Sequence, residues 1–179
     1  MALSQSSVTH NAQPTCPASK QSRRRPALLQ HYAASGAYTD CYAATVPGQV
    51  SLAELMAAFH TIPVFKRERW LLARLPSLPS TDQEAQLLAE GSLIRFSAWK
   101  VERRESNQAI LSAGRTRSWL MASQDPGGSG TTALFFGSAI EPRGRGGLGW
   151  QFNALLLFHK AYSRILLASA IRRVARGRP

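Results

Sequence analysis

The sequence predicts an α+β domain in which a curved antiparallel sheet is followed by a long C-terminal helix packed across it, with two short helices after the first strand. Three observations carry this prediction. A strand pattern at residues 38–46 precedes helical patterns, four further strand patterns lie between residues 93 and 140, and a long helical pattern covers residues 149–174. Short connections between the later strands favour antiparallel hairpins. A sheet with an apolar face needs a cover, and the longest helix is the obvious one.

The first half of the predicted domain is a strand followed by helices. Residues 38–46 alternate aromatic, small and β-branched side chains before a Pro-Gly turn, as a strand does. Ser51 and Glu54 have the spacing of a capping box, which opens a helix. A second helix is expected over residues 63–75, between two prolines, and residues 81–90 form a further short helix or turn.

The later strands are expected at residues 93–102, 109–112, 115–122 and 131–140, each bounded by residues typical of turns. Both sides of the last two strands carry apolar side chains. We therefore expect one face of the sheet to meet the long helix and the other to be only partly solvated.

The long helix covers residues 149–174, and its apolar side chains recur at spacings of three and four, as in an amphipathic helix. Its length would allow it to cross a membrane, but Lys160 and Arg164 lie in the middle of the span. Each would cost about 2.5–3.5 kcal/mol at the centre of a bilayer. The helix is therefore predicted to pack on the sheet, and no transmembrane segment is expected.

The net charge of +12 is carried by the two ends of the chain. Residues 1–37 contain four basic and no acidic residues, and residues 142–179 contain eight basic and no acidic residues. We expect residues 1–37 to be a disordered basic tail, residues 38–175 to be a single domain, and residues 176–179 to be a basic C-terminal end. No apolar segment follows a basic start, so a secretory signal is not predicted and we expect a cytoplasmic protein, peripheral to the membrane if its basic ends contact lipid.

Two stretches, YTDCY near the start and FHKAYSRILLASAIRR near the end, carry a family resemblance. They are similar to the marker stretches of the uncharacterised bacterial domain-of-unknown-function family numbered 2867. The matching positions are Tyr38, Asp40, Tyr42, Phe158, His159, Tyr162 and Arg164. The chain departs from the family at Leu157, where a proline usually precedes the Phe-His pair. The order of elements also resembles the helix-grip fold of the START and Bet v 1-like superfamily. Over residues 38–175 this resemblance implies a cavity between a curved sheet and the C-terminal helix, and no established activity.

Six side chains are candidates for lining such a cavity and binding an apolar small molecule: His159, Tyr162, Trp119, Phe135, Trp99 and Asp40. His159 lies on the apolar side of the long helix, where it would act as a polar handle or as a hydrogen-bonded core histidine. Asp40 could pair with His159 or an arginine, or be an ordinary strand residue. The aromatic residues are equally suited to a plain core.

Five arginines are candidates for anion binding: Arg143, Arg145, Arg172, Arg173 and Arg176. The first two lie in a glycine-rich loop before a helix, and the others near a helix C-terminus, where cations also stabilise the helix dipole. They suggest a second function, weak binding to anionic lipid or RNA.

No constellation of acid, base and nucleophile can be assembled, so an enzyme of unknown reaction is the third and least favoured hypothesis. Neither a cofactor motif nor metal-ligand spacing occurs. Cys16 and Cys41 form no CxxC motif and are expected to be unpaired.

Overall fold

The computed structural model describes residues 27–61, 81–125, 127–142 and 163–174. In chain order the elements are α1 (Ala27–Ala34), β1 (Tyr38–Pro47), α2 (Leu52–Thr61), α4 (Asp82–Glu90), β2 (Arg95–Phe96), β3 (Trp99–Arg104), β4 (Gln108–Ala113), β5 (Thr116–Gln124) and β6 (Thr131–Ile140). A C-terminal helical segment covers residues 163–174.

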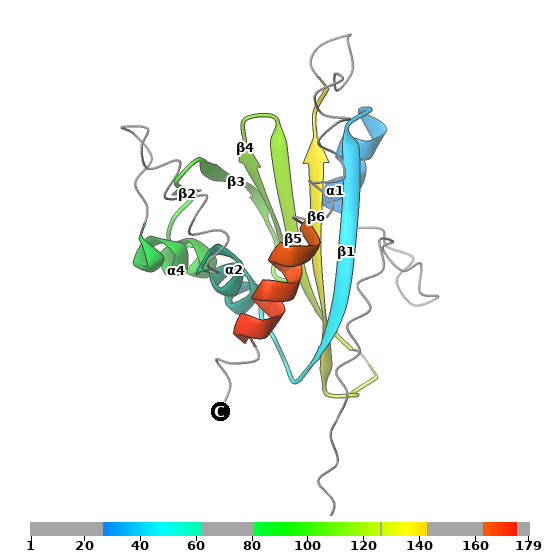
Figure 1. Cartoon of the computed structure of the whole chain (residues 1–179), viewed down its shortest axis with the longest axis vertical. Coiled ribbons are helices and arrows are strands. Elements are labelled where there is room, and N and C mark those ends of the chain that lie inside the picture. The colour runs from blue at the N-terminus through cyan, green and yellow to red at the C-terminus, as the bar shows by residue number, and fades with distance from the viewer. Residues whose placement is uncertain (1–26, 62–80, 126, 143–162, 175–179) are drawn as a thin grey trace, which may run out of the picture.

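The strands form one six-stranded sheet in the order β1-β6-β5-β4-β3-β2, with every neighbouring pair antiparallel. Strands β2 to β6 are joined by short connections, as the sequence predicts. The first strand, β1, adds to the free side of β6 in unbroken register from Tyr38 opposite Ile140 to Pro47 opposite Thr131. The C-terminal helix lies across this curved sheet (Figure 1), so the predicted fold class is confirmed.

The main core lies on the inner face of the sheet, which we define as the face toward α2, α4 and residues 163–174. Apolar side chains from all these elements form one buried cluster. Its C-terminal helix members, Leu166, Leu167, Ala170 and Val174, recur at helical spacing. The predicted packed side of this helix is confirmed at Leu166 and is wrong at Ile165, which is 50% exposed. Burial of each large side chain contributes about 1.5–3 kcal/mol. Members from the sheet include Tyr42, Leu111, Leu120, Leu134 and Phe136.

A second apolar cluster lies on the opposite, outer face, where α1 packs against the sheet. Leu28, Leu29 and Tyr32 of α1 contact a group of sheet residues that includes Ile110, Trp119 and Ala139. The approach is close: a Cβ atom at Gly137 would lie only 2.9 Å from Cδ2 of Leu29 and 2.8 Å from the backbone oxygen of Asp40. The glycine therefore makes room for α1 at the centre of β6.

The predicted disordered tail is wrong for residues 27–34, which form α1. Leu28, Leu29 and Tyr32 are buried against the outer face, and this burial favours the ordered helix over a disordered tail. The segment is too short for its spacing of apolar residues to predict a helix. The rest of the predicted tail, residues 1–26, lies outside the described residues.

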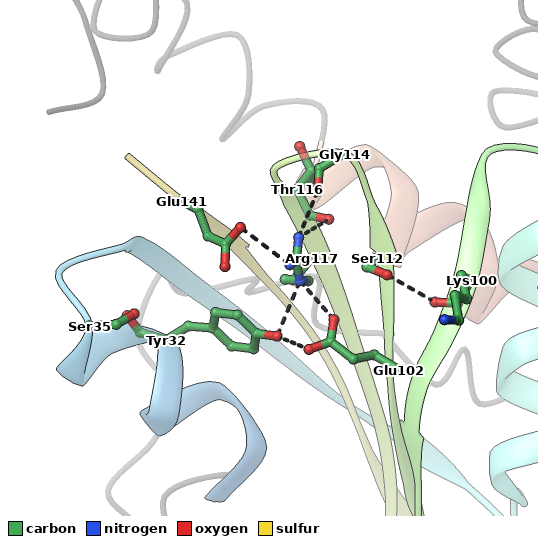
Figure 2. A network of polar contacts seen from close by, with 9 residues as sticks. All are labelled: Tyr32, Ser35, Lys100, Glu102, Ser112, Gly114, Thr116, Arg117 and Glu141. Carbon is green, nitrogen blue, oxygen red and sulfur yellow. Dashed lines mark hydrogen bonds and ion pairs between the residues drawn. The ribbon is translucent and has the colours of Figure 1, made fainter. Parts of the chain in front are cut away.

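A polar network also fastens α1 to the outer face, centred on the half-buried Arg117 (Figure 2). The Nε of Arg117 lies 2.8 Å from Oε2 of Glu102 and donates to the hydroxyl of Tyr32 at 3.1 Å. Its Nη2 donates to Glu141 at 3.2 Å, and its Nη1 donates to the carbonyl of Gly114 at 2.9 Å. The Tyr32 hydroxyl donates in turn to Glu102. One guanidinium thus joins the helix, two strands and the segment after β6.

The predicted caps and short helices are largely confirmed. The backbone N–H of Ser51 donates to Glu54 at 2.7 Å and the N–H of Glu54 donates to the Ser51 hydroxyl at 3.2 Å, which completes the capping box of α2. The segment at residues 81–90 forms α4 with a second capping box. The helix predicted over residues 63–75 and the first part of the long helix lie outside the described residues.

One predicted strand is two strands in the structure. Residues 93–102 are divided by a two-residue turn at Ser97-Ala98, where Ser97 has φ 53°. Beyond it, β3 shifts register between Val101 and Arg103. The guanidinium of Arg104 then reaches the end of α4 and donates to the carbonyl oxygen of Leu88 at 3.0 Å.

Candidate functional site

A polar cluster lies on the inner face of the sheet where β1 pairs with β6. In the sequence YTDCY, Tyr38, Asp40 and Tyr42 occupy alternate positions, so a strand presents all three on one face. Tyr42 belongs to the inner core, which places the three on the inner face. The register adds Ser138 of β6 directly opposite Asp40, and Ser118 of β5 directly opposite Ser138. We call Tyr38, Asp40, Tyr42 and Ser138 the Asp40 cluster.

The carboxylate of Asp40 accepts hydrogen bonds on both oxygens. Its Oδ1 accepts from the backbone N–H of Ser138 at 3.0 Å and from the Ser138 hydroxyl at 2.5 Å. Its Oδ2 accepts from the hydroxyls of Tyr38 and Tyr42, each at 3.3 Å. The short bonds to Ser138 hold the carboxylate in place, and the long bonds to the tyrosines leave their hydroxyls more easily diverted to another acceptor.

Both tyrosines stay neutral phenols at physiological pH. Burial, followed by the negative charge of Asp40, raises the pKa of Tyr42 to about 12. The same two causes raise the pKa of Tyr38 well above its ordinary value. Neither phenol can therefore supply the tyrosinate that a general base needs near neutrality. Each hydroxyl donates to Asp40, and a phenol oxygen can also accept a hydrogen bond.

The start of the described C-terminal helix lies against this cluster. The guanidinium carbon of Arg164 lies 5.8 Å from the centre of the Tyr42 ring, within the range of a cation–π contact. Its neighbour Ser163 is 1% exposed, and the Ser163 hydroxyl has no hydrogen-bond partner among the described residues. A buried hydroxyl without a partner costs about 1–3 kcal/mol. A polar atom of a bound molecule could satisfy it.

The structure does not bring the six predicted ligand-binding residues together. Asp40 lies in the cluster described above. Trp99 belongs to the inner apolar core, but on β3, four strands away from β1, or about 19 Å at the usual strand spacing. His159 and Tyr162 lie outside the described residues.

Trp119 and Phe135 lie on the outer face, which corrects the expectation that they line the same cavity as Asp40. Trp119 is fully buried under α1, and its indole N–H donates to the side-chain oxygen of Gln108 at 2.9 Å. Their chain neighbours Leu120 and Phe136 face the inner core instead. Because side chains alternate along a strand and both faces of β5 and β6 are apolar, the sequence pattern did not show which face was the inner one.

Of the five predicted anion-binding residues, Arg172 and Arg173 are exposed on the C-terminal helix, with its apolar side buried against the sheet. Arg143, Arg145 and Arg176 lie outside the described residues. Within the described ranges no group of His, Cys, Asp or Glu is arranged to hold a metal ion. None of the helices described is both long and apolar enough to cross a membrane.

Ser138 was not predicted to belong to a site, and Tyr38 and Tyr42 were named only for a family resemblance. The alternate spacing of Tyr38, Asp40 and Tyr42 on a predicted strand was the signal that could have grouped these three. No local signal exists for Ser138, which is 98 residues from Asp40 in the chain. The expectation of an unpaired Cys41 is also wrong, since Cys41 is disulfide-bonded.

Comparisons of the chain with protein families, curated proteins and solved structures give no match in any of the three. The resemblance to an uncharacterised bacterial family and to the START and Bet v 1-like superfamily therefore stays a prediction.

Proposed function

We propose that this chain is a binding domain for a small molecule that has an apolar body and a hydrogen-bonding end. The ligand lies between the inner face of the sheet and the C-terminal helix, with its polar end at the Asp40 cluster. One observation carries the proposal: a carboxylate and two neutral phenols occur together on the inner face, and the helix that covers this face has a buried hydroxyl, on Ser163, with no hydrogen-bond partner among the described residues.

The chemistry of the cluster favours a ligand that carries a hydroxyl or N–H group. Carboxylate and phenol oxygens accept hydrogen bonds, and the Ser163 hydroxyl can donate or accept. Small-molecule sites commonly combine mostly apolar walls with a few such polar groups. The apolar walls would come from the core residues beside Tyr42, such as Leu120 and Phe136.

Binding is favoured over catalysis at this cluster. The hydroxyls of Tyr38 and Tyr42 are held as donors to Asp40, and the raised pKa of each keeps it protonated. Asp40 is itself occupied by the N–H and hydroxyl of Ser138. A reaction would need one of these groups to exchange a proton with substrate near neutral pH, and their arrangement opposes it.

The competing interpretation is that the cluster only fastens β1 to β6. The hydrogen bonds given above run between the chain's own residues, and a half-buried carboxylate bonded in this way stabilises a sheet without any ligand. If the cluster binds a ligand, removal of a phenol oxygen weakens the binding of a small apolar molecule. If the cluster only fastens the strands, that binding does not depend on the phenol oxygen.

The test uses a neutral phenylnaphthylamine dye, which has an apolar body, one N–H donor and fluorescence that rises in apolar surroundings. We expect the intact chain to bind it, and Tyr38→Phe and Tyr42→Phe each to weaken binding about 2- to 12-fold, the range for loss of one hydrogen bond. Tyr32→Phe is the matched control, because it removes the same hydroxyl from the outer face.

Circular dichroism establishes that each variant is folded. Absence of dye binding by the intact chain, or equal loss of affinity in Tyr32→Phe and Tyr42→Phe, would overturn the proposal. Native mass spectrometry of protein purified from the cells that make it then identifies the natural ligand as a discrete added mass, which Tyr42→Phe should reduce.

A further inference from the structure

Ser118 on β5 is polar and yet buried on the inner face of the sheet. Its side chain is 8% exposed, and no hydrogen bond joins its hydroxyl to another described residue. The next residues along the strand fix its direction, since Trp119 belongs to the outer cluster and Leu120 to the inner core. Because side chains alternate along a strand, Ser118 points to the same side as Leu120. A buried hydroxyl without a partner is unfavourable, because its hydrogen bonds to water are lost.

The register places Ser118 directly opposite Ser138, a member of the Asp40 cluster. The N–H of Glu141 donates to the carbonyl of Arg115 at 3.0 Å, so this pair of the β5–β6 ladder is hydrogen-bonded. Hydrogen-bonded and non-hydrogen-bonded pairs alternate, so Ser118 and Ser138, three positions further along, form a non-hydrogen-bonded pair. In such a pair the Cα atoms lie about 4.5 Å apart and the side chains are close. The Ser118 hydroxyl therefore extends the polar row that Asp40 and Ser138 begin.

A ligand hydroxyl fits between the two serines. The Ser138 hydroxyl donates to Asp40 at 2.5 Å, so any further hydrogen bond to its oxygen is one that it accepts. The Ser118 hydroxyl can donate or accept. Hydrogen bonds between hydroxyls are about 2.8 Å long, so one ligand hydroxyl could contact both side chains across this pair.

The helix that covers the inner face directs a second buried hydroxyl toward the same layer. Ser163 is 1% exposed and has no partner among the described residues. It precedes the buried Leu166, Leu167 and Ala170 by three, four and seven positions, which places it on the packed side of the helix. Sheet and helix thus each present a neutral hydroxyl to the layer between them.

We infer that the polar end of the ligand carries two neighbouring hydroxyl groups, as in a vicinal diol, and that Ser118 selects for the second one. This inference rests on the proposed function, because it concerns the ligand of the same layer. One hydroxyl binds at the Asp40 cluster, and the second binds Ser118 and the oxygen of Ser138. A hydroxyl suits this place better than a carbonyl or a carboxylate, because it can donate to the acceptor oxygens there as well as accept. A ligand with one hydroxyl would leave Ser118 without a partner.

Displacement of the phenylnaphthylamine dye by octanol and by the vicinal octanediol tests this inference. We expect Ser118→Ala to weaken binding of the diol about 2- to 12-fold, the range for loss of one hydrogen bond, and to leave binding of octanol unchanged. Tyr42→Phe should weaken binding of both alcohols, because it acts on the hydroxyl that they share. Ser123→Ala is the matched control, because Ser123 lies on the outer side of the same strand, like Trp119, and should affect neither alcohol.

Circular dichroism shows whether each variant is folded, and Ser118→Cys, with a weaker donor of similar size, replaces an alanine variant that is not. Equal loss of affinity for both alcohols in Ser118→Ala, or no loss for the diol, would overturn the role of Ser118 and leave the proposed function standing. Tighter binding of octanoate than of the diol would overturn the choice of a diol. If neither alcohol displaces the dye, the inference fails, and the effect of Tyr42→Phe on the dye itself decides whether the proposed function fails with it.

Discussion

Replacing Gly137 with alanine tests how closely β1 and α1 pack against β6. A methyl group at this position would lie 2.8 Å from the backbone oxygen of Asp40, 2.9 Å from Cδ2 of Leu29 and 3.1 Å from Cε3 of Trp119. Favourable contacts between carbon atoms begin at about 3.5 Å. The Leu29 side chain could turn away, but the Asp40 oxygen is held in the ladder between β1 and β6.

The size of the effect follows from two opposing contributions. Overpacking of a well-filled core costs about 1–3 kcal/mol. Replacing a strand glycine by alanine returns about 0.5–1 kcal/mol, because the unfolded chain has less conformational freedom to lose. We therefore expect Gly137→Ala to lower the free energy of unfolding by about 1–2 kcal/mol, measured by urea denaturation with far-ultraviolet circular dichroism.

A double-mutant cycle with Leu29→Ala locates the strain. Leu29→Ala alone should cost about 2–5 kcal/mol, as for a buried leucine, and the two changes together should cost less than their sum because the clash is relieved. Gly127→Ala is the control, since a Cβ atom there meets nothing closer than 3.4 Å. If Gly137→Ala is as stable as the original chain, the close approach of Asp40 to Gly137 is refuted. If its effect simply adds to that of Leu29→Ala, the Leu29 side chain does not contribute to the strain.

Three further predictions concern other parts of the fold. The pKa of Tyr42 is raised to about 12 from its ordinary value of 10.0, so between pH 10 and 12 the unfolded chain releases the Tyr42 proton first. The free energy of unfolding should fall over that interval by up to about 3 kcal/mol, and Tyr42 should not affect it below pH 10. Urea titrations at pH 9 and pH 11 should show a smaller fall in this free energy for Tyr42→Phe than for the original chain. An equal fall in both proteins would contradict the burial of the phenol. Arg104→Met should lower the free energy of unfolding by about 2 kcal/mol, because it removes the hydrogen bonds to the carbonyls of Leu88 and Ala89 at the end of α4. Amide hydrogen exchange should become faster in α4 than in the sheet. An equal increase in both would argue against a local cap. Leu166→Asp should unfold the domain, because the Leu166 side chain is only 4% exposed and the variant would bury a carboxylate in the core. A cooperative thermal transition close to that of the original chain would show that the helix is not packed there.

The sequence by itself determined the features that depend on neighbouring residues. The capping box of Ser51 and Glu54 needs only three residues of separation, and the structure forms it. The extent of β6, residues 131–140, follows from one uninterrupted strand pattern. The amphipathic character of the C-terminal helix follows from apolar residues spaced by three and four, and the sequence placed Leu166 on its buried side but not Ala170 or Val174. In each case the interaction that sets the structure acts within a few residues along the chain.

The tertiary structure alone decided which side of each strand faces the main core. Alternation separates Trp119 from Leu120 and Phe135 from Phe136, but both sides of these strands are apolar and either could be the inner one. The choice depends on which helix covers which face, and the covering helix α1 is too short for its pattern to stand out from the tail. The Asp40 cluster has the same origin. Asp40 and Ser138 meet because β1 joins the free side of β6, a pairing of residues 98 positions apart that depends on closing a long loop and not on any local pattern.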